Sequence, residues 1–203
     1  MKRVVLMALL ALALPLTAFA GGSVDFTNSG GTLSGSSAGL SLSGSTLIAV
    51  NGLGGMGLVT GSLGTVSFST GALMGPSTGL QMGGMFAGGG SFVITGNGTN
   101  GIPNSVIFNG SFSGPVTWTM VTLGNGTHNY TLTGAITGTW INGSTVNGAT
   151  VQLTINTGRG FFNGSNTISS GDTNVTVPEP GTLGLLGTGL VGLAGVMRRK
   201  LKG

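Results

Sequence analysis

The stretch 115–157, PVTWTMVTLGNGTHNYTLTGAITGTWINGSTVNGATVQLTINT, decides the fold of this chain. Three of its segments alternate apolar with polar residues, and their apolar members are Val116, Trp118 and Met120, then Tyr130, Leu132, Ile136 and Trp140, then Val151, Leu153 and Ile155. A period of two is typical of a strand with one buried face and one polar face. Asn125-Gly126 and the loop 142–148 separate the segments, and Asn and Gly tolerate the positive φ of tight hairpin turns. The stretch therefore predicts an antiparallel meander.

The same pattern continues outward in shorter segments. Val66 with Phe68, Phe92 with Ile94, and Val106 with Phe108 alternate in the same way, and no segment of the body shows a helical period. Asn-Gly pairs begin at Asn51, Asn97, Asn109, Asn125, Asn142, Asn147 and Asn163. We predict an all-β domain over 21–170, an antiparallel β-sandwich or meander. A solenoid is less favoured because the strand spacing is irregular.

Other parts of the body give weaker signals. Residues 21–64 are rich in Gly, Ser and Leu, and their scattered apolar positions predict strands of modest stability. Gly83-Gly84 and Gly88-Gly89-Gly90 predict a loop, and the polar stretch 171–177 predicts a short linker.

The N-terminus has the three parts of a signal peptide. Lys2-Arg3 precede an apolar run over 4–14, and Ala18-Phe19-Ala20 places small residues at the positions that signal peptidase requires before Gly21. We predict cleavage after Ala20, so that residues 1–20 are removed. The alternative, a retained membrane anchor, is disfavoured by the short apolar run.

The C-terminus has a different three-part pattern. Pro178-Glu179-Pro180 is followed by an uncharged apolar stretch, 181–197, and then by a basic cluster, Arg198, Arg199, Lys200 and Lys202. As a helix the apolar stretch would span about 25 Å, adequate for a thin bilayer. Basic clusters stay cytoplasmic, so we expect a transmembrane helix with the body outside.

This tail, 177–203, resembles the PEP-CTERM sorting signal, whose Pro-Glu-Pro motif, hydrophobic segment and terminal basic cluster occur here in order. The resemblance implies processing by exosortase, a membrane-embedded enzyme of Gram-negative bacteria that make extracellular polysaccharide. It implies recognition and cleavage at Pro178-Glu179-Pro180, and transient anchoring in the membrane before delivery to the cell surface or matrix. The family of the body between the two ends is not identified by any motif.

Charge is concentrated in these two ends. The chain has seven Lys and Arg against three Asp and Glu, yet the only charged residues between Gly21 and Val177 are Asp25, Arg159 and Asp172, a net charge of −1. A nucleic-acid ligand needs a basic patch, so nucleic-acid binding is rejected. The chain has no cysteine, which excludes disulfides, zinc thiolate sites and cysteine nucleophiles.

The body offers few groups for catalysis. A glycosidase needs two carboxylates across one bond, and Asp25 and Asp172 lie near opposite ends of the body, so we do not expect them to meet. A serine triad would need His128 beside an acid, but His128 is interpreted as an exposed turn residue. Calcium, zinc and phosphate motifs are incomplete. No catalytic, cofactor or metal residue is predicted, and the chain is interpreted as a non-enzyme.

Two function hypotheses remain. The first is a non-enzymatic surface or matrix protein, associated with exopolysaccharide or biofilm. The alternative is a carbohydrate- or ice-binding β module that uses Trp118, Trp140 and Tyr130, or the Thr-x-Thr ranks at Thr117/Thr119, Thr131/Thr133 and Thr137/Thr139. The apolar parity of both tryptophans predicts that they are core residues, and Thr also suits the solvent face of any strand.

Overall fold

The computed structural model describes residues 22–176, an all-β body with one short helix, α2, and two 3₁₀ turns, η2 and η3. The strands are β1 (Ser23–Ser29), β2 (Thr32–Ser36), β3 (Gly39–Asn51), β4 (Val59–Ser69), β5 (Leu73–Met74), β6 (Gly84–Phe86), β7 (Gly89–Gly96), β8 (Val106–Phe112), β9 (Val116–Thr122), β10 (His128–Trp140), β11 (Thr145–Asn156), β12 (Ser165–Thr167) and β13 (Ser170–Thr176). The helical turns are η2 (Leu53–Gly55), α2 (Gly79–Met82) and η3 (Thr99–Gly101).

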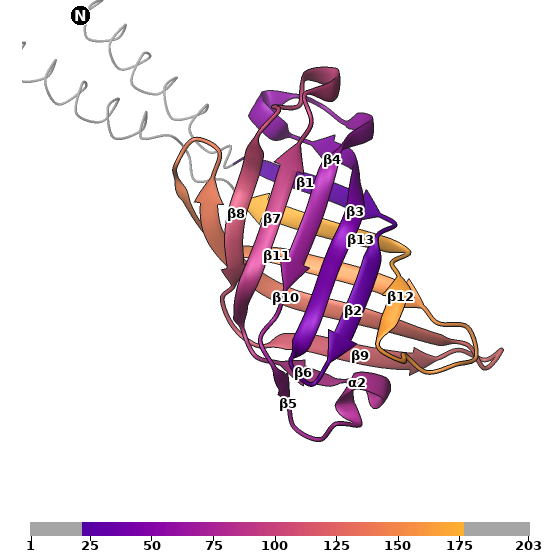
Figure 1. The fold of residues 1–203 in the computed structure, drawn as a ribbon. Helices are drawn as coiled ribbons and strands as arrows, with labels where there is room; N and C mark the ends of the chain where they lie inside the picture. Colours follow the sequence, from indigo (N-terminus) through magenta and orange to yellow (C-terminus); the bar gives the residue numbers. More distant parts are fainter. Residues whose placement is uncertain (1–21, 177–203) are drawn as a thin grey trace, which may run out of the picture. The chain divides into compact units, whose positions relative to one another are not determined.

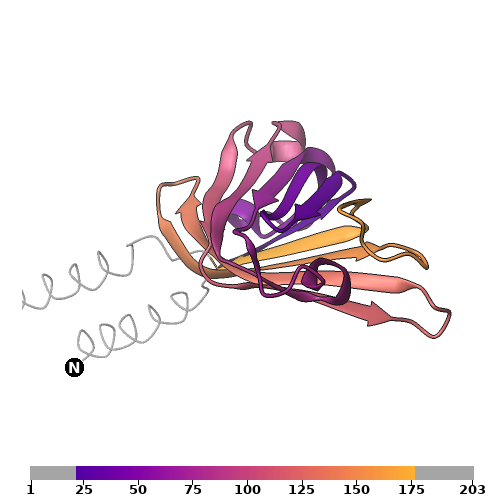
Figure 2. The ribbon, with the colours of Figure 1, turned by 60° about the horizontal axis from the view of Figure 1, so that its bottom comes forward.

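Eight of the strands form a closed antiparallel barrel in place of the predicted sandwich. The order around the ring is β1, β3, β4, β7, β8, β10, β11 and β13, and β13 returns to β1. Figure 1 shows β8, β7, β4, β3 and β2 side by side in front, with β1, β13, β11, β10 and β9 crossing behind them. Turned by 60°, Figure 2 shows the two layers from their edge. The prediction of all-β structure is confirmed, and the sandwich is corrected to a barrel because β13 pairs with both β1 and β11.

Two long strands join the layers. Strand β10 pairs with β11 along its length, and on its other side it pairs with β9 through Thr133 and then with β8 from Ile136. Strand β3 behaves in the same way, with β4 on one side and β2 followed by β1 on the other. Gly44, with φ of 66°, lies where β3 changes partner, a conformation that is open to glycine without steric cost.

The core fills the space between the layers. One group of stacked and edge-on rings consists of Phe68, Phe92, Phe108 and Phe112. A second group consists of Trp118, Tyr130 and Phe162, and it lies beneath α2. Such edge-to-face and offset pairs add to the free energy gained from burying the rings.

The meander predicted over 115–157 is confirmed as β9, β10 and β11, with the turn at Asn125-Gly126. Its second turn is shorter than predicted. Asn142-Gly143 lies in it, whereas Gly148, with φ of 76°, lies within β11 where the register with β10 shifts. Asn109-Gly110 is not a turn but part of β8.

Two other predictions are wrong. Residues 171–176 of the expected linker belong to β13, which lies between β1 and β11 in the ring. Its inward positions are Gly171, Thr173 and Val175. Only one of them is a large apolar residue, so the segment lacks the alternation of apolar and polar residues that indicates a strand. The expected loop at Gly83-Gly84 and 88–90 is partly strand, because Gly84 begins β6 and Gly89 begins β7.

The predicted processing segments lie outside the described residues. These are the signal peptide with Ala18, Ala20 and Gly21, the Pro178-Glu179-Pro180 motif, the helix expected over 181–197, and the basic cluster Arg198, Arg199, Lys200 and Lys202. Between residues 22 and 176, no helix has the length and apolar character needed to cross a membrane.

Candidate functional site

A row of polar side chains crosses the five neighbouring strands β9, β10, β11, β13 and β1. These strands form the rear layer of Figure 1, and the row lies on its outer face. In register, from β9 to β1, the row consists of Thr117, Thr133, Gln152, Asp172 and Thr27. Alternation along each strand turns these side chains away from the core, and adjacent strands hold them about 4.8 Å apart. The row is therefore a regular line of hydroxyl, amide and carboxylate groups.

A second row lies beside the first, two residues along each strand. It consists of Thr119, Thr131, Thr154 and Ser170. Two of the three predicted Thr-x-Thr ranks thus meet on one face. The third lies further along β10, beyond the register shift with β11, where Thr137 and Thr139 pair with Ser111 and Asn109 of β8. The Thr137 hydroxyl bonds to the Val146 carbonyl at 2.9 Å and to Asn147 Oδ1 at 2.7 Å.

A shallow pocket of about 440 Å³ opens on the same face. Its lining includes both carboxylates of the body, Asp25 and Asp172, together with Asn174 and Gln152. Asp25 lies opposite Asn174, and Asp172 lies two residues along β13 from Asn174. The expectation that these two acids do not meet is therefore wrong, because pairing of β1 with β13 joins the two ends of the body.

The pocket offers groups that accept and donate hydrogen bonds. The carboxylates accept, while the Gln152 and Asn174 amides and the Thr133 and Thr150 hydroxyls can do both. Such a mixture suits a ligand rich in hydroxyl groups. Within residues 22–176, no three His, Asp or Glu side chains converge as the ligands of a metal ion would.

His128 lies elsewhere and is not the exposed turn residue that we expected. It is the first residue of β10, only 8% of it is exposed, and its ring stacks on Phe161 with centroids 4.5 Å apart. Its Nδ1 lies 3.0 Å from the Thr122 hydroxyl. Asp172 lies two strands and five residues away, roughly 19 Å at standard strand spacings, and on the other face of the sheet. These two residues do not form the pair that a triad requires.

The aromatic residues considered for ligand binding are in the core, as the parity of the two tryptophans predicts. Trp118 is 1% exposed, Trp140 is 6% exposed and Tyr130 is fully buried. The Trp118 indole donates to the Leu80 carbonyl at 2.9 Å, and the Tyr130 hydroxyl donates to the Gln81 carbonyl at 2.6 Å. Both acceptors are carbonyls of α2, so these bonds attach α2 to the barrel. The polar atoms of the two rings are therefore bonded within the fold and do not face a ligand.

The pocket is not predictable from local sequence pattern without β13, the strand that supplies Asp172 and Asn174. The signal is present in 170–176, where outward Ser170, Asp172, Asn174 and Thr176 alternate with buried positions. Without large apolar residues at those buried positions, the alternation resembles a polar linker. Once β13 is recognised, Asp172 and Gln152 take their places in the first row.

Comparison with known proteins identifies the C-terminal segment. Residues 176–200 match the family described as the PEP-CTERM protein-sorting motif, which confirms the resemblance drawn from the tail. Neither a curated protein nor a solved structure matches the chain.

Proposed function

We propose, from the PEP-CTERM motif at residues 176–200, that the chain is an exported protein sorted by exosortase, and that its barrel is a non-enzymatic component of the cell surface or of the extracellular polysaccharide matrix. The observation that carries the proposal is the pair of polar rows on β9, β10, β11, β13 and β1. A polysaccharide presents repeated hydroxyl groups, and rows of Thr, Ser and Gln can hydrogen-bond to them along a chain.

The charge of the barrel supports the same proposal. Its only formal charges are Asp25, Arg159 and Asp172, so electrostatic repulsion between neighbouring copies or from an acidic polymer is weak. Little charge means that binding depends on hydrogen bonds and shape, and it predicts that association with the matrix changes little with ionic strength.

The test compares the secreted protein in three fractions: cells, isolated polysaccharide and cell-free medium. We expect the protein with cells and polysaccharide in the wild-type strain, and retention in the membrane fraction when exosortase is deleted. A protein found only as a soluble species in the medium would contradict the proposal.

Variants of the barrel face locate the contact. Thr133→Val combined with Gln152→Ala removes two members of the first row, and we expect weaker retention on the strain's own polysaccharide. Thr65→Val combined with Ser67→Ala is the matched control, because these residues are exposed on β4 in the front layer. Equal loss from both variants would exclude a specific face.

The alternative is a carbohydrate- or ice-binding module. The regular register of hydroxyl groups in the two rows supports this alternative. Burial of Trp118, Trp140 and Tyr130 removes the aromatic platform, so this alternative rests on the hydroxyl rows. Inhibition of ice recrystallisation by the purified protein, lost in Thr119→Val with Thr131→Val, would favour ice over polysaccharide. Release of reducing ends from polysaccharide, abolished by Asp172→Asn, would overturn the non-enzymatic assignment.

A further inference from the structure

Both ends of the described chain leave the barrel at the same end. Ser23, where β1 begins, lies opposite Thr176, where β13 finishes. Since all strands of the ring are antiparallel, this barrel end also carries the loops 52–58, 97–105 and 141–144. We call it the terminal end, and Figure 1 shows these loops at the top and upper left, with α2 at the bottom.

The sorting signal follows the barrel with almost no spacer. Thr176 is separated from Pro178 by a single residue, and the apolar stretch begins at Gly181. Five Cα steps join Thr176 to Gly181, which span at most about 18 Å in a fully extended chain. Because β13 occupies the stretch expected to be a linker, a membrane-inserted tail would hold the terminal end within that distance of the bilayer.

The terminal end carries apolar side chains exposed to solvent. Leu58 is 68% exposed, Val106 is 46% exposed and Ile141 is 42% exposed. Each lies at the margin of a ring strand: Leu58 before β4, Val106 at the start of β8, and Ile141 after β10. The three loops contain no charged residue. Exposed apolar groups among uncharged polar loops suit the boundary between lipid headgroups and acyl chains.

We propose that the terminal end is a lipid-contacting surface, on which the barrel rests against the bilayer while the tail is attached, with Leu58, Val106 and Ile141 at the headgroup boundary. This inference rests on the export in the proposed function and on the membrane anchoring that the tail predicts. It goes beyond them by assigning an orientation. The barrel wall that carries the polar rows extends away from the bilayer, and the end of the barrel opposite the terminal end faces away from the membrane. The short covalent connection favours lipid over a second copy of the chain as the partner.

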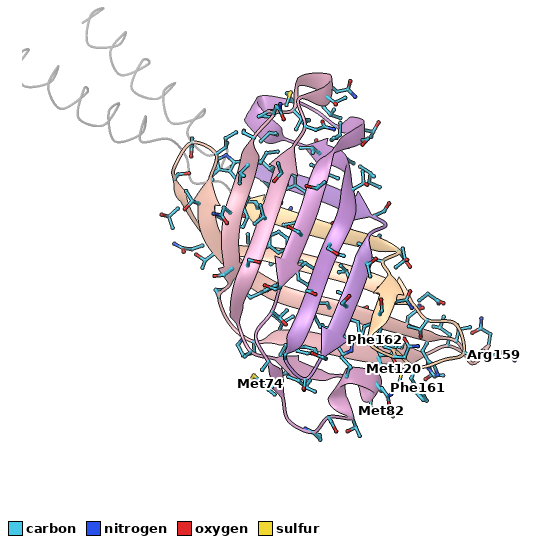
Figure 3. The ribbon with its side chains drawn as sticks, viewed as in Figure 1. Met74, Met82, Met120, Arg159, Phe161 and Phe162 are labelled. Atoms are coloured by element: carbon cyan, nitrogen blue, oxygen red, sulfur yellow. The ribbon has the colours of Figure 1, made fainter. Side chains whose placement is uncertain are left out.

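The opposite end provides an internal control. It also exposes apolar side chains, including Met82 at 57% and Phe161 at 47%, but it has no covalent connection to a membrane segment. Figure 3 shows Met82, the last residue of α2, and Phe161 at this end. A surface that contacts lipid only because it is apolar would include these residues, whereas a tethered orientation excludes them.

The chain has no cysteine, so single cysteines can be labelled without a background. The experiment uses the full chain in vesicles of phosphatidylethanolamine and phosphatidylglycerol, with Leu58→Cys, Val106→Cys, Ile141→Cys, Met82→Cys and Phe161→Cys each carrying an environment-sensitive fluorophore. We expect a blue-shifted emission and quenching by lipid-borne quenchers at 58, 106 and 141, and neither at 82 and 161. Unchanged emission of the buried tryptophans shows that each variant is folded.

Co-flotation with the vesicles is measured first. It distinguishes a failure of tail anchoring from a failure of the proposed orientation. No flotation would contradict tail anchoring, and with it this inference. Flotation with quenching at 82 and 161, or with equal quenching at both ends, would overturn the orientation while leaving the sorting function intact. Loss of quenching at 58 after removal of the tail would support an orientation that the tether imposes.

Discussion

Asp25 on β1 and Asp172 on β13 lie diagonally across one antiparallel strand pair, on the outer face of the barrel. Asp25 faces Asn174 and Asp172 faces Thr27, so each carboxylate has an uncharged residue directly opposite and the other carboxylate one diagonal away. Cβ atoms in such diagonal positions are about 7 Å apart. The only cation of the barrel, Arg159, belongs to the stretch between β11 and β12, so two like charges share one pocket.

The first prediction concerns this pair of carboxylates. Asp172→Asn removes one of two neighbouring negative charges and should raise the free energy of unfolding by a few tenths of a kcal/mol. The gain should shrink as salt screens the repulsion. Urea unfolding of the wild type and the variant at low and high ionic strength measures both effects.

A double-mutant cycle with Asp25→Asn provides the control. Either single substitution relieves the same repulsion, so the double variant should gain little over the better single one. Additive gains at low salt would show that the two carboxylates do not interact, and would contradict the shared pocket.

The second prediction concerns the contact between Gly138 on β10 and Gly110 on β8, which lie directly opposite each other. A Cβ at Gly138 would lie 2.6 Å from the Gly110 Cα and would overlap the Asn109 carbonyl. Backbone atoms in the middle of a closed sheet move only at high cost, so Gly138→Ala should lower the free energy of unfolding by about 2–3 kcal/mol.

Gly114→Ala is the matched control for that substitution. A Cβ at Gly114 would meet nothing within 4 Å, and Gly114 has no positive φ. Its replacement should be neutral or stabilise slightly, because alanine lowers the entropy of the unfolded chain. Equal midpoints of thermal unfolding for the two variants would be inconsistent with close approach of β8 and β10.

Local pattern was enough to predict the central hairpins. In β9, β10 and β11, large apolar residues occupy every buried position except those of His128 and Ala149, and Asn125-Gly126 marks a turn. Closure of the barrel was not predictable in this way. It depends on pairing the first strand with the last, and the inward residues of β13 include Gly171 and Thr173, which give no hydrophobic signal.

The candidate site was also predictable only in the part that depends on local sequence pattern. The Thr ranks of β9 and β10 were predictable as outward-facing, because they alternate with Trp118 and Leu132. Their continuation through Gln152 and Asp172 to Thr27 requires the register of strands distant in sequence. His128 was misassigned because a polar residue next to a turn is usually exposed, whereas here Phe161 covers its ring.

The third prediction tests β13 through two adjacent residues. Val175 is 0% exposed and points into the core, while Asn174 is exposed on the outer face. Val175→Asp would bury an unpaired charge and should prevent stable folding, since a buried charge without a partner costs several kcal/mol. Asn174→Asp should retain the fold. Circular dichroism and the yield of soluble protein distinguish the two, and comparable behaviour would mean that 170–176 is a linker after all.

The last prediction concerns Tyr130, whose hydroxyl joins two segments. It donates to the Gln81 carbonyl at 2.6 Å and accepts from the Phe162 amide at 3.0 Å. Tyr130→Phe keeps the ring but leaves both backbone groups without that partner, so the free energy of unfolding should fall by about 1–3 kcal/mol. Amide exchange should accelerate in α2 and at Phe162, while the barrel strands keep their protection.

Thr133→Val is the control for the loss of a hydroxyl on the same strand. Thr133 is exposed, so its replacement should change the unfolding free energy by less than about 0.5 kcal/mol. If Tyr130→Phe unfolded at the same urea concentration as this control, with α2 exchanging at the wild-type rate, the phenol would not be the group that holds α2 to the barrel. The Trp118 indole, through its bond to the Leu80 carbonyl, would then carry that attachment alone.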